Sequence, residues 1–310
     1  LETALRHNPA DARAHLFLGN LLYARGQREE GFVHWRQAVE HDDRLALAWR
    51  NVGYAERHLH RDLSKAHDAL EKAFRLRPRD AWVLHELDQV ARKLGRPAQE
   101  RLALLEQHYD VVETRDSLLR NLIDLRLDFG DVENLQKAYR DLSEHHFHSW
   151  EGKYGIHDCW LEVNQELGDR AFEKGDFDRA LHHYQEACEY PKNLEVAART
   201  PDFRGHVYWD LAKTRLAMEN DELAADYLKK IVAEQYTKPH LGTFYQALAQ
   251  KALGNTEAYR ELLATLRARV EALTSGKYEH RGTGEAIGHY LLSLLLKHQG
   301  DAAAAAAEEQ

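Results

Sequence analysis

The sequence contains few of the residues that interrupt helices or build covalent frameworks. Its 310 residues include 6 prolines, 18 glycines and 2 cysteines. Scarce proline suits long helices, because proline lacks a backbone N–H and clashes with the preceding turn. Cys159 and Cys188 fit neither a disulfide framework nor a zinc-binding spacing. We therefore expect a helical protein that binds no metal and no cofactor.

Long apolar runs and catalytic motifs are also missing. The longest apolar stretch, residues 290–296, is far shorter than the roughly 20 residues that span a membrane. No Walker loop, G-x-G-x-x-G, G-x-S-x-G or H-E-x-x-H sequence occurs. We expect a protein that is not an enzyme, has no membrane partner and is cytoplasmic. A removed leader is the alternative, because the chain begins at Leu1.

Charge is unevenly distributed along the chain. The formal net charge is -9, but residues 1–108 carry 18 Lys and Arg against 16 Asp and Glu, and the rest carries 24 against 35. Acidic chains are repelled by the phosphate backbone, so no nucleic-acid partner is expected. With 44% hydrophobic residues the chain can bury a substantial core.

A frame of large and small residues recurs about every 34 positions. It appears at Leu18-Gly19, Val52-Gly53 and Leu87-Asp88, whose second members are 34 and 35 positions apart. A second half-frame follows, with Trp35 and Leu70 as its large residues. We expect Gly19 and Gly53 to let a paired helix approach closely enough for these side chains to fill the adjacent space.

Other glycines predict helix ends in the left-handed conformation. They are Gly26, Gly95, Gly130, Gly175, Gly254 and Gly300. The hairpins between them predict four segments: regular repeats over 1–142, an irregular His- and Trp-containing loop over 143–159, degenerate repeats over 160–273, and a C-terminal helix with an Ala-rich tail over 274–310. The fifth hairpin is clear, with Gly168 followed by Tyr184. The seventh is expected to be shortened, and the last helix to span residues 289–298.

The chain opens on a pattern like the end of a second helix. Leu1, Ala4 and Pro9 repeat the spacing found at positions 70, 73 and 78. We expect the chain to start inside a truncated hairpin and to be a fragment of a longer protein, with a degenerate cap as the alternative.

The repeat resembles the tetratricopeptide signature W-x2-L-G-x2-Y, A-x3-F and a closing proline. The resemblance implies an all-α protein, a right-handed α-solenoid of about seven to eight helical hairpins that is irregular in its second half. Four short stretches also resemble the repeat region of large bacterial proteins of unknown function that have a β-rich N-terminal domain. These stretches are residues 8–11, 102–106, 147–152 and 190–194.

In tetratricopeptide arrays the first helix of each hairpin lines the concave face. Counted from the frame, the candidate groove residues are Asn20, Tyr23, Arg50, Tyr54, Arg57, His85, Gln89, Arg92 and Arg120, with His58, Lys93 and Asp124 beside them. Arginine can hold a carboxylate through two hydrogen bonds, and tyrosine and arginine are common in binding hot spots. The set predicts a groove for a peptide or protein segment, for which an acidic sequence is one option. A solvated helix face is the alternative.

One subset of the family grips a C-terminal carboxylate with a Lys/Asn/Asn/Lys/Arg clamp. Asn20 matches one clamp position, but Leu16, Tyr54, Trp82 and Glu86 stand at the others. The resemblance therefore does not extend to that chaperone-tail subtype.

The irregular loop offers further candidates. His145, His146 and His148 could supply metal ligands, but their spacing fits no standard zinc pattern, so surface histidines are favoured here and at positions 182 and 183. His148, Trp150 and Glu151 could instead face a sugar or a partner. The favoured alternative is that Trp150 is a structural anchor between hairpins.

The leading interpretation is a non-catalytic scaffold that binds a protein or peptide, or the missing N-terminal domain of the same protein. The rival is an accessory helical-repeat domain of a carbohydrate-active enzyme whose other domain lies outside this chain. In that case a sugar response would depend on Trp150 and Glu151. An α/α-barrel glycosidase fits less well, since spacings of 34 and 35 residues do not favour closure into a ring.

Overall fold

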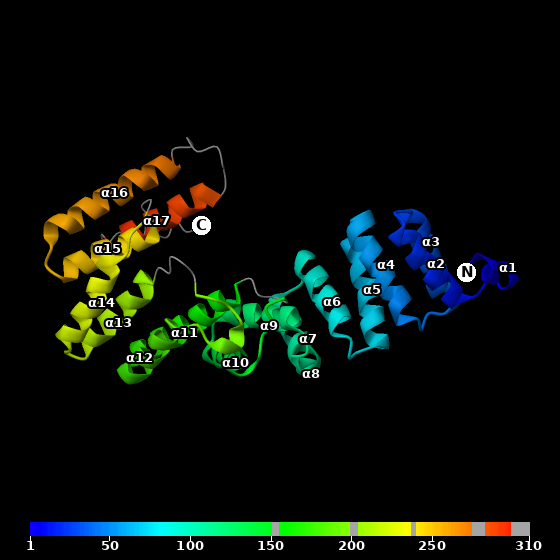
Figure 1. Cartoon of the computed structure of the whole chain (residues 1–310), viewed down its shortest axis with the longest axis horizontal. Helices are drawn as coiled ribbons and strands as arrows, with labels where there is room; N and C mark the ends of the chain where they lie inside the picture. Colours follow the sequence, from blue (N-terminus) through cyan, green and yellow to red (C-terminus); the bar gives the residue numbers. More distant parts are fainter. Residues whose placement is uncertain (151–154, 199–203, 237–239, 275–282, 299–310) are drawn as a thin grey trace. The chain divides into compact units, whose positions relative to one another are not determined.

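A computed structural model describes residues 1–150, 155–198, 204–236, 240–274 and 283–298. In these ranges the chain forms seventeen α-helices, one π-helical turn and one 3-10 turn, and no strand. The helices pack pairwise as consecutive hairpins (Figure 1), which confirms the all-α tetratricopeptide-like expectation. None of the described helices is long and apolar enough to cross a membrane.

The chain divides into two compact units. Unit 1 comprises residues 1–159 and 191–196, and unit 2 comprises residues 160–190 and 197–310. Within a hairpin, the helix that comes first in the chain is called the first helix and its partner the second helix.

Unit 1 starts with the short helix α1 (Glu2–His7). Its first helices are α2 (Ala12–Ala24), α4 (Ala46–Ala55), α6 (Ala81–Lys93) and α9 (Asp116–Phe129). Its second helices are α3 (Arg28–His41), α5 (Leu63–Leu76), α7 (Ala98–Gln107) and α10 (Val132–Glu144). Three short elements complete it: the π-helical turn η1 (Glu56–His60), α8 (Tyr109–Val112) and the 3-10 turn η2 (Lys192–Leu194).

Unit 2 contains most of α11 (Ile156–Glu173) and all later hairpins. Its other first helices are α13 (Gly205–Ala217), α15 (Leu241–Ala252) and α17 (Thr283–His298). Its second helices are α12 (Phe177–Glu186), α14 (Asp221–Ala233) and α16 (Thr256–Thr274).

Helix bounds differ from the prediction in three places. The seventh hairpin is not shortened, because α16 has 19 residues. Leu266 and Val270 in its second half are buried against Leu291 and Leu295 of α17, which explains the extra length. The last helix starts at residue 283 rather than 289. The irregular loop is also shorter than expected, because α10 ends at Glu144 and α11 begins at Ile156.

Three hairpins close where the sequence predicts a glycine against a large side chain. A Cβ atom on Gly19 would lie 2.5 Å from Trp35 Cδ1. One on Gly53 would lie 2.7 Å from Leu70 Cγ, and one on Gly168 would lie 2.5 Å from Tyr184 Cε1. Non-bonded carbon atoms pack at roughly 3.5–4.0 Å, so any side chain at these glycines would push the two helices apart. The predicted packing frame is therefore confirmed.

The turn glycines also behave as predicted. Gly26, Gly95, Gly130, Gly175 and Gly254 all have φ between 64° and 87°. This left-handed region is open to glycine at little cost, so each of these residues can end a helix and reverse the chain. Gly300 lies outside the described residues.

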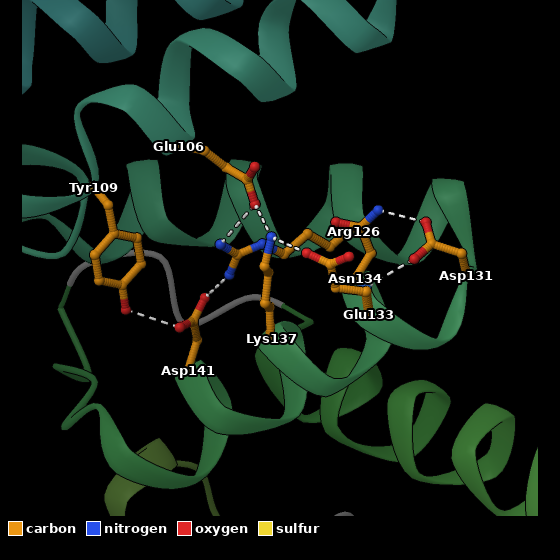
Figure 2. Close-up of polar contacts among 8 residues, drawn as sticks. All are labelled: Glu106, Tyr109, Arg126, Asp131, Glu133, Asn134, Lys137 and Asp141. Carbon is orange, nitrogen blue, oxygen red and sulfur yellow. Dashed lines mark hydrogen bonds and ion pairs between the residues drawn. The ribbon is translucent and has the colours of Figure 1, made fainter.

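The α6/α7 and α9/α10 hairpins contain buried ion pairs. Asp88, at the frame position of Gly19 and Gly53, accepts hydrogen bonds from Arg101 Nε (2.8 Å) and Nη2 (3.0 Å). In the next hairpin the buried Arg126 of α9 donates to Asp141 of α10 and to Glu106 of α7 (3.2 Å), as Figure 2 shows. Charge-assisted hydrogen bonds therefore join the helices of these two hairpins, whereas the first two hairpins pack a glycine against a large side chain.

Candidate functional site

Polar side chains join neighbouring first helices of unit 1 in a row that we call the first-helix ladder. In its first rung, Asn20 Oδ1 of α2 accepts hydrogen bonds from Asn51 Nδ2 of α4 and from Trp35 Nε1, both at 2.8 Å. In its last rung, Asn121 Nδ2 of α9 donates to Asp88 Oδ2 of α6 at 2.9 Å. The ladder thus fixes the side chains on the face that the sequence singles out as the groove.

The second rung joins Arg50 of α4 to Glu86 of α6. Arg50 Nε and Nη2 donate to the two carboxylate oxygens at 3.3 and 3.4 Å. Trp82 Nε1 donates to the same carboxylate at 2.9 Å, and the Arg50 guanidinium lies 5.3 Å from the centre of the Trp82 ring. The positive charge of Arg50 is therefore compensated within unit 1, which makes this position less basic than the sequence suggests.

The third rung pairs its cation with a neutral amide. Arg57 Nη2 donates to Gln89 Oε1 at 2.8 Å, and Gln89 Nε2 donates to His85 Nε2 at 2.7 Å. Burial, with the charge of Arg115 as the next cause, lowers the pKa of His85 to about 4. The imidazole is then neutral at neutral pH and can accept this bond. Arg57 is thus held in place by a neutral amide, and no acidic partner lies within ion-pair distance of it among the described residues.

Aromatic rings support the same face. Tyr23 stacks on Trp35 with ring centres 4.8 Å apart and meets the edge of Tyr54 at 6.0 Å. Tyr54 in turn lies 4.4 Å from the His58 ring. Burial raises the pKa of Tyr23, so its hydroxyl stays protonated. These contacts connect α2 with α4 beside the polar rungs.

The remaining groove candidates fall into two groups. Arg92 and Lys93 are exposed in the last turn of α6. Arg120 of α9 instead donates from Nε to Asp124 at 2.8 Å, and the Cys159 thiol donates to the same carboxylate at 3.4 Å. Arg120 therefore already has an acidic partner within unit 1.

The same first helices also carry exposed apolar side chains. Of these, the sequence analysis included only Tyr54 among the candidate groove residues. Phe17, Leu47, Tyr54 and Trp82 are between 38% and 53% exposed. Leu47 and Trp82 each precede a frame residue, Gly53 or Asp88, by six positions. This shared register was the signal that could have identified them. The face therefore combines apolar anchors with the ladder's amides and guanidinium groups.

A buried carboxylate holds the irregular loop. Asp116, at the start of α9, pairs with His145 Nε2 (2.9 Å), His148 Nδ1 (3.1 Å) and the backbone N–H of His148 (2.5 Å). His145 and His148 keep part of their surface exposed, as expected, but both are engaged by this carboxylate. The expectation of a surface histidine is wrong for His183, which is buried and whose Nδ1 lies 3.0 Å from Asn164 Oδ1.

The anchor of this loop is not Trp150. That side chain is 80% exposed, whereas Phe147 is buried and its backbone N–H donates to Asn193 O at 2.7 Å. Phe147, not Trp150, is therefore the buried aromatic side chain of the described part of this loop. Glu151 lies outside the described residues. Within the described ranges, no group of three or more His, Cys, Asp or Glu side chains is placed to hold a metal ion.

Two hollows of about 480 Å³ lie beside second helices of unit 1. The first has Val39, Trp49, Val52 and Ala69 among its lining residues, between α3, α4 and α5. The other lies over the buried ion pairs of Figure 2 and is lined by Glu106, Tyr109, Glu113, Arg126, Lys137, Arg140, Asp141 and Glu144. Neither of these two hollows is lined by a candidate groove residue.

No protein-family model matches the sequence. A solved structure of YrrB, described as a TPR protein with an unusual peptide-binding site, is 16% identical; the match covers 85% of this chain and 97% of that chain, with a TM-score of 0.32. A structure of Naa15/Naa10 bound to HypK-THB is also 16% identical. That match covers 99% of this chain and 59% of the other, with a TM-score of 0.48. A structure of PilF from Pseudomonas aeruginosa is 16% identical. That match covers 82% of this chain and 96% of the other, with a TM-score of 0.36.

Because all three TM-scores are below 0.5, these similarities give no information on function. The fold follows from the hairpins themselves. Their pairwise packing, the glycine contacts at Gly19, Gly53 and Gly168, and the left-handed turn glycines together make this chain a tetratricopeptide-like helical-repeat protein.

Proposed function

We propose that this chain is a non-catalytic scaffold that binds a protein or peptide segment along the first-helix face of unit 1. The observation that carries the proposal is the combination, on α2, α4 and α6, of exposed apolar side chains with an ordered row of polar groups. Phe17, Leu47 and Trp82 offer apolar area to a partner. Exposed apolar groups of this kind, bordered by polar ones, are typical of interaction sites.

Preorganisation favours binding at this face. Ordering a flexible side chain at an interface costs roughly 0.5–1.5 kcal/mol. Asn20, Asn51 and Gln89 are already held by hydrogen bonds within unit 1. Their remaining donors and acceptors can therefore meet the backbone of an extended segment with little further loss of entropy.

An acidic partner segment remains our preferred option. Arg50 and Arg120 are compensated by Glu86 and Asp124. Arg57 is held by a neutral amide, and Arg92 is exposed. A carboxylate on the partner would therefore meet its strongest attraction near Arg57. The partner could equally be a further domain of a longer bacterial protein, as the narrower sequence resemblance implies.

A displayed peptide library selected on the chain, followed by titration of the enriched peptides, tests the proposal. We expect Arg57→Ala to weaken binding about tenfold, or about 1.4 kcal/mol, and to lower its salt dependence. Arg36→Ala, which removes an exposed cation from the second helix α3, is the matched control and should leave binding unchanged. Equal affinity of Arg57→Ala and the unaltered chain across salt concentrations would remove the basic-groove idea.

A second candidate function rests on Trp150. Its exposed indole lies 4.8 Å from the His148 ring, and flat exposed aromatic rings can stack on sugars. In this alternative the chain is an accessory domain of a carbohydrate-active enzyme. A thermal-shift screen that compares oligosaccharides with acidic peptides separates the two functions. A sugar response lost in Trp150→Ala or Glu151→Ala supports the alternative, and a response to peptides alone supports the scaffold.

A further inference from the structure

The end of α4 differs from the ends of the neighbouring first helices. Past α2 and α6 the chain reverses at Gly26 (φ 87°) and Gly95 (φ 69°). After α4 it continues into the π-helical turn η1 and reverses at Arg61, which has φ 60°. A side chain in this left-handed conformation is strained, and such residues and π-helical turns are both frequent at functional sites. An arginine therefore stands where its neighbours use a glycine.

Four cations lie at or just past the C-terminal ends of α4 and α6. Arg57 lies on η1, Arg61 follows it, and Arg92 and Lys93 occupy the last turn of α6. We call these four residues the cation patch. None of them has an acidic partner within ion-pair distance among the described residues, in contrast to Arg50. The patch is thus a concentration of positive charge that the described part of unit 1 does not neutralise.

Arg57 joins η1 to α6 through its hydrogen bond to Gln89, and three of the four charges act on His58 between them. Burial lowers the pKa of His58, and the nearby charges of Arg57, Arg61 and Lys93 lower it further, against the opposing effect of Glu86. Arg57 also has a buried Nε atom without a hydrogen-bond partner in the described ranges. The helix dipole favours cations in a last turn, which accounts for Arg92 and Lys93. It does not account for the strained backbone at Arg61.

Building on the proposed function, we propose that the cation patch is an anion subsite of the first-helix face and holds an acidic side chain of the bound segment. The shared chemistry is a carboxylate or phosphate group, which arginine can hold through two charge-assisted hydrogen bonds. Arg61 is kept at this turn, in our proposal, because its charge contributes to binding and a glycine would not.

The variant Arg61→Gly tests the subsite without damaging the fold, since glycine adopts the same backbone conformation freely. Peptides enriched on the unaltered chain are resynthesised with Glu, phosphoserine or Gln at each acidic position and titrated. We expect the Glu or phosphoserine form to bind at least fivefold more tightly than the Gln form. Arg61→Gly should reduce that preference severalfold, while its melting temperature stays the same or rises.

Arg36→Gln is the matched control, because it removes one positive charge from a second helix. It should leave the preference for acidic peptides intact. Equal binding of acidic and Gln peptides, or an unchanged preference in Arg61→Gly, would overturn the subsite and leave the scaffold proposal standing. A lower melting temperature with weaker binding of every peptide would also overturn it, because Arg61 would then be structural. If no peptide is enriched at all, the scaffold proposal and the subsite fall together.

Discussion

The two units share the same helix contact but compensate their carboxylates differently. In unit 1, Arg50 precedes its frame glycine by three positions and donates to Glu86, which precedes the next frame residue by two. In unit 2, Gln165 and Asp210 occupy the same two positions, and Gln165 Nε2 donates to Asp210 Oδ2 at 3.4 Å. An amide thus replaces a guanidinium in the equivalent rung.

This replacement changes the electrostatics of unit 2. Burial raises the pKa of Asp210 to about 6, which the nearby Lys213 opposes and Asp169 reinforces. Asp169 itself accepts a hydrogen bond from the Tyr184 hydroxyl at 2.5 Å, and no cation lies within ion-pair distance of it among the described residues. Lys213 Nζ lies 3.2 Å from Asp210 Oδ1, so the cation beside this carboxylate comes from its own helix α13. The same backbone geometry can therefore carry a carboxylate whose charge partner lies on the preceding first helix, as in unit 1, or on its own helix, as in unit 2.

The largest expected effect comes from removing an arginine partner in unit 1. Arg126→Leu leaves the buried Asp141 without its guanidinium, and losing one member of a buried pair typically costs about 3–5 kcal/mol. The free energy of unfolding, followed by hydrogen exchange in α9 and α10, should fall by that amount. The double variant Arg126→Leu/Asp141→Leu should be less destabilised than the single one. A single variant within about 1 kcal/mol of the unaltered chain would contradict the role given to arginine.

The next effect concerns Asp210 in unit 2. Its folded-state pKa lies above the unfolded value, so its contribution to stability is complete below about pH 4 and is lost as pH rises through about 6. Asp210→Asn removes this pH-dependent loss of stability, because the asparagine amide does not ionise. As pH is raised from 4 to 7.5, we expect the free energy of unfolding of the variant to increase by about 2–3 kcal/mol relative to that of the unaltered chain. Denaturant unfolding of unit 2 measures this difference.

Glu86→Gln is the control for this second prediction. It changes the equivalent carboxylate of unit 1, which pairs with Arg50, and should destabilise the chain at pH 7.5 rather than stabilise it. If Asp210→Asn shifted stability equally at both pH values, the contrast between the two units would be lost.

The smallest expected effects test the contact that the units share. Gly53→Leu in unit 1 and Gly168→Leu in unit 2 place a side chain against Leu70 and Tyr184, and such overpacking costs about 1–3 kcal/mol. Both variants should lower the unfolding midpoint of their own unit by similar amounts. Gln99→Leu adds a leucine at an exposed position of α7 and should be near neutral. Neutral glycine variants would mean that the frame does not determine the packing.

Much of the fold could be predicted from the sequence because its signals are local. The recurring small residues Gly19, Gly53 and Gly168 identify where paired helices approach, since close approach needs the absence of a side chain. The length of α16 could not be predicted in this way. Its second half is determined by burial against α17, a helix separated from it by an intervening segment of the chain.

The candidate site was only partly predictable. Counting from the frame assigns Asn20, Arg57 and Gln89 to the first helices. In the structure Asn20 lies on α2 and Gln89 on α6, whereas Arg57 lies on the π-helical turn η1 that follows α4. It does not reveal that Arg50 and Arg120 have acidic partners, because those pairs depend on side-chain geometry. The sequence also favoured Trp150 as the anchor of the irregular loop, whereas the structure buries Phe147 and leaves Trp150 80% exposed.

The sequence alone determined that this chain forms helical hairpins of a period near 34 residues, because side-chain size and glycine conformation act over a few residues. Only the tertiary structure decided which charges are compensated and which stay available to a partner. The physical reason is that hydrogen bonds and ion pairs between helices depend on distances of a few ångströms between residues some thirty positions apart. Arg50 and Arg57 lie seven positions apart in the sequence, yet Arg50 donates to the carboxylate of Glu86 and Arg57 to the neutral amide of Gln89.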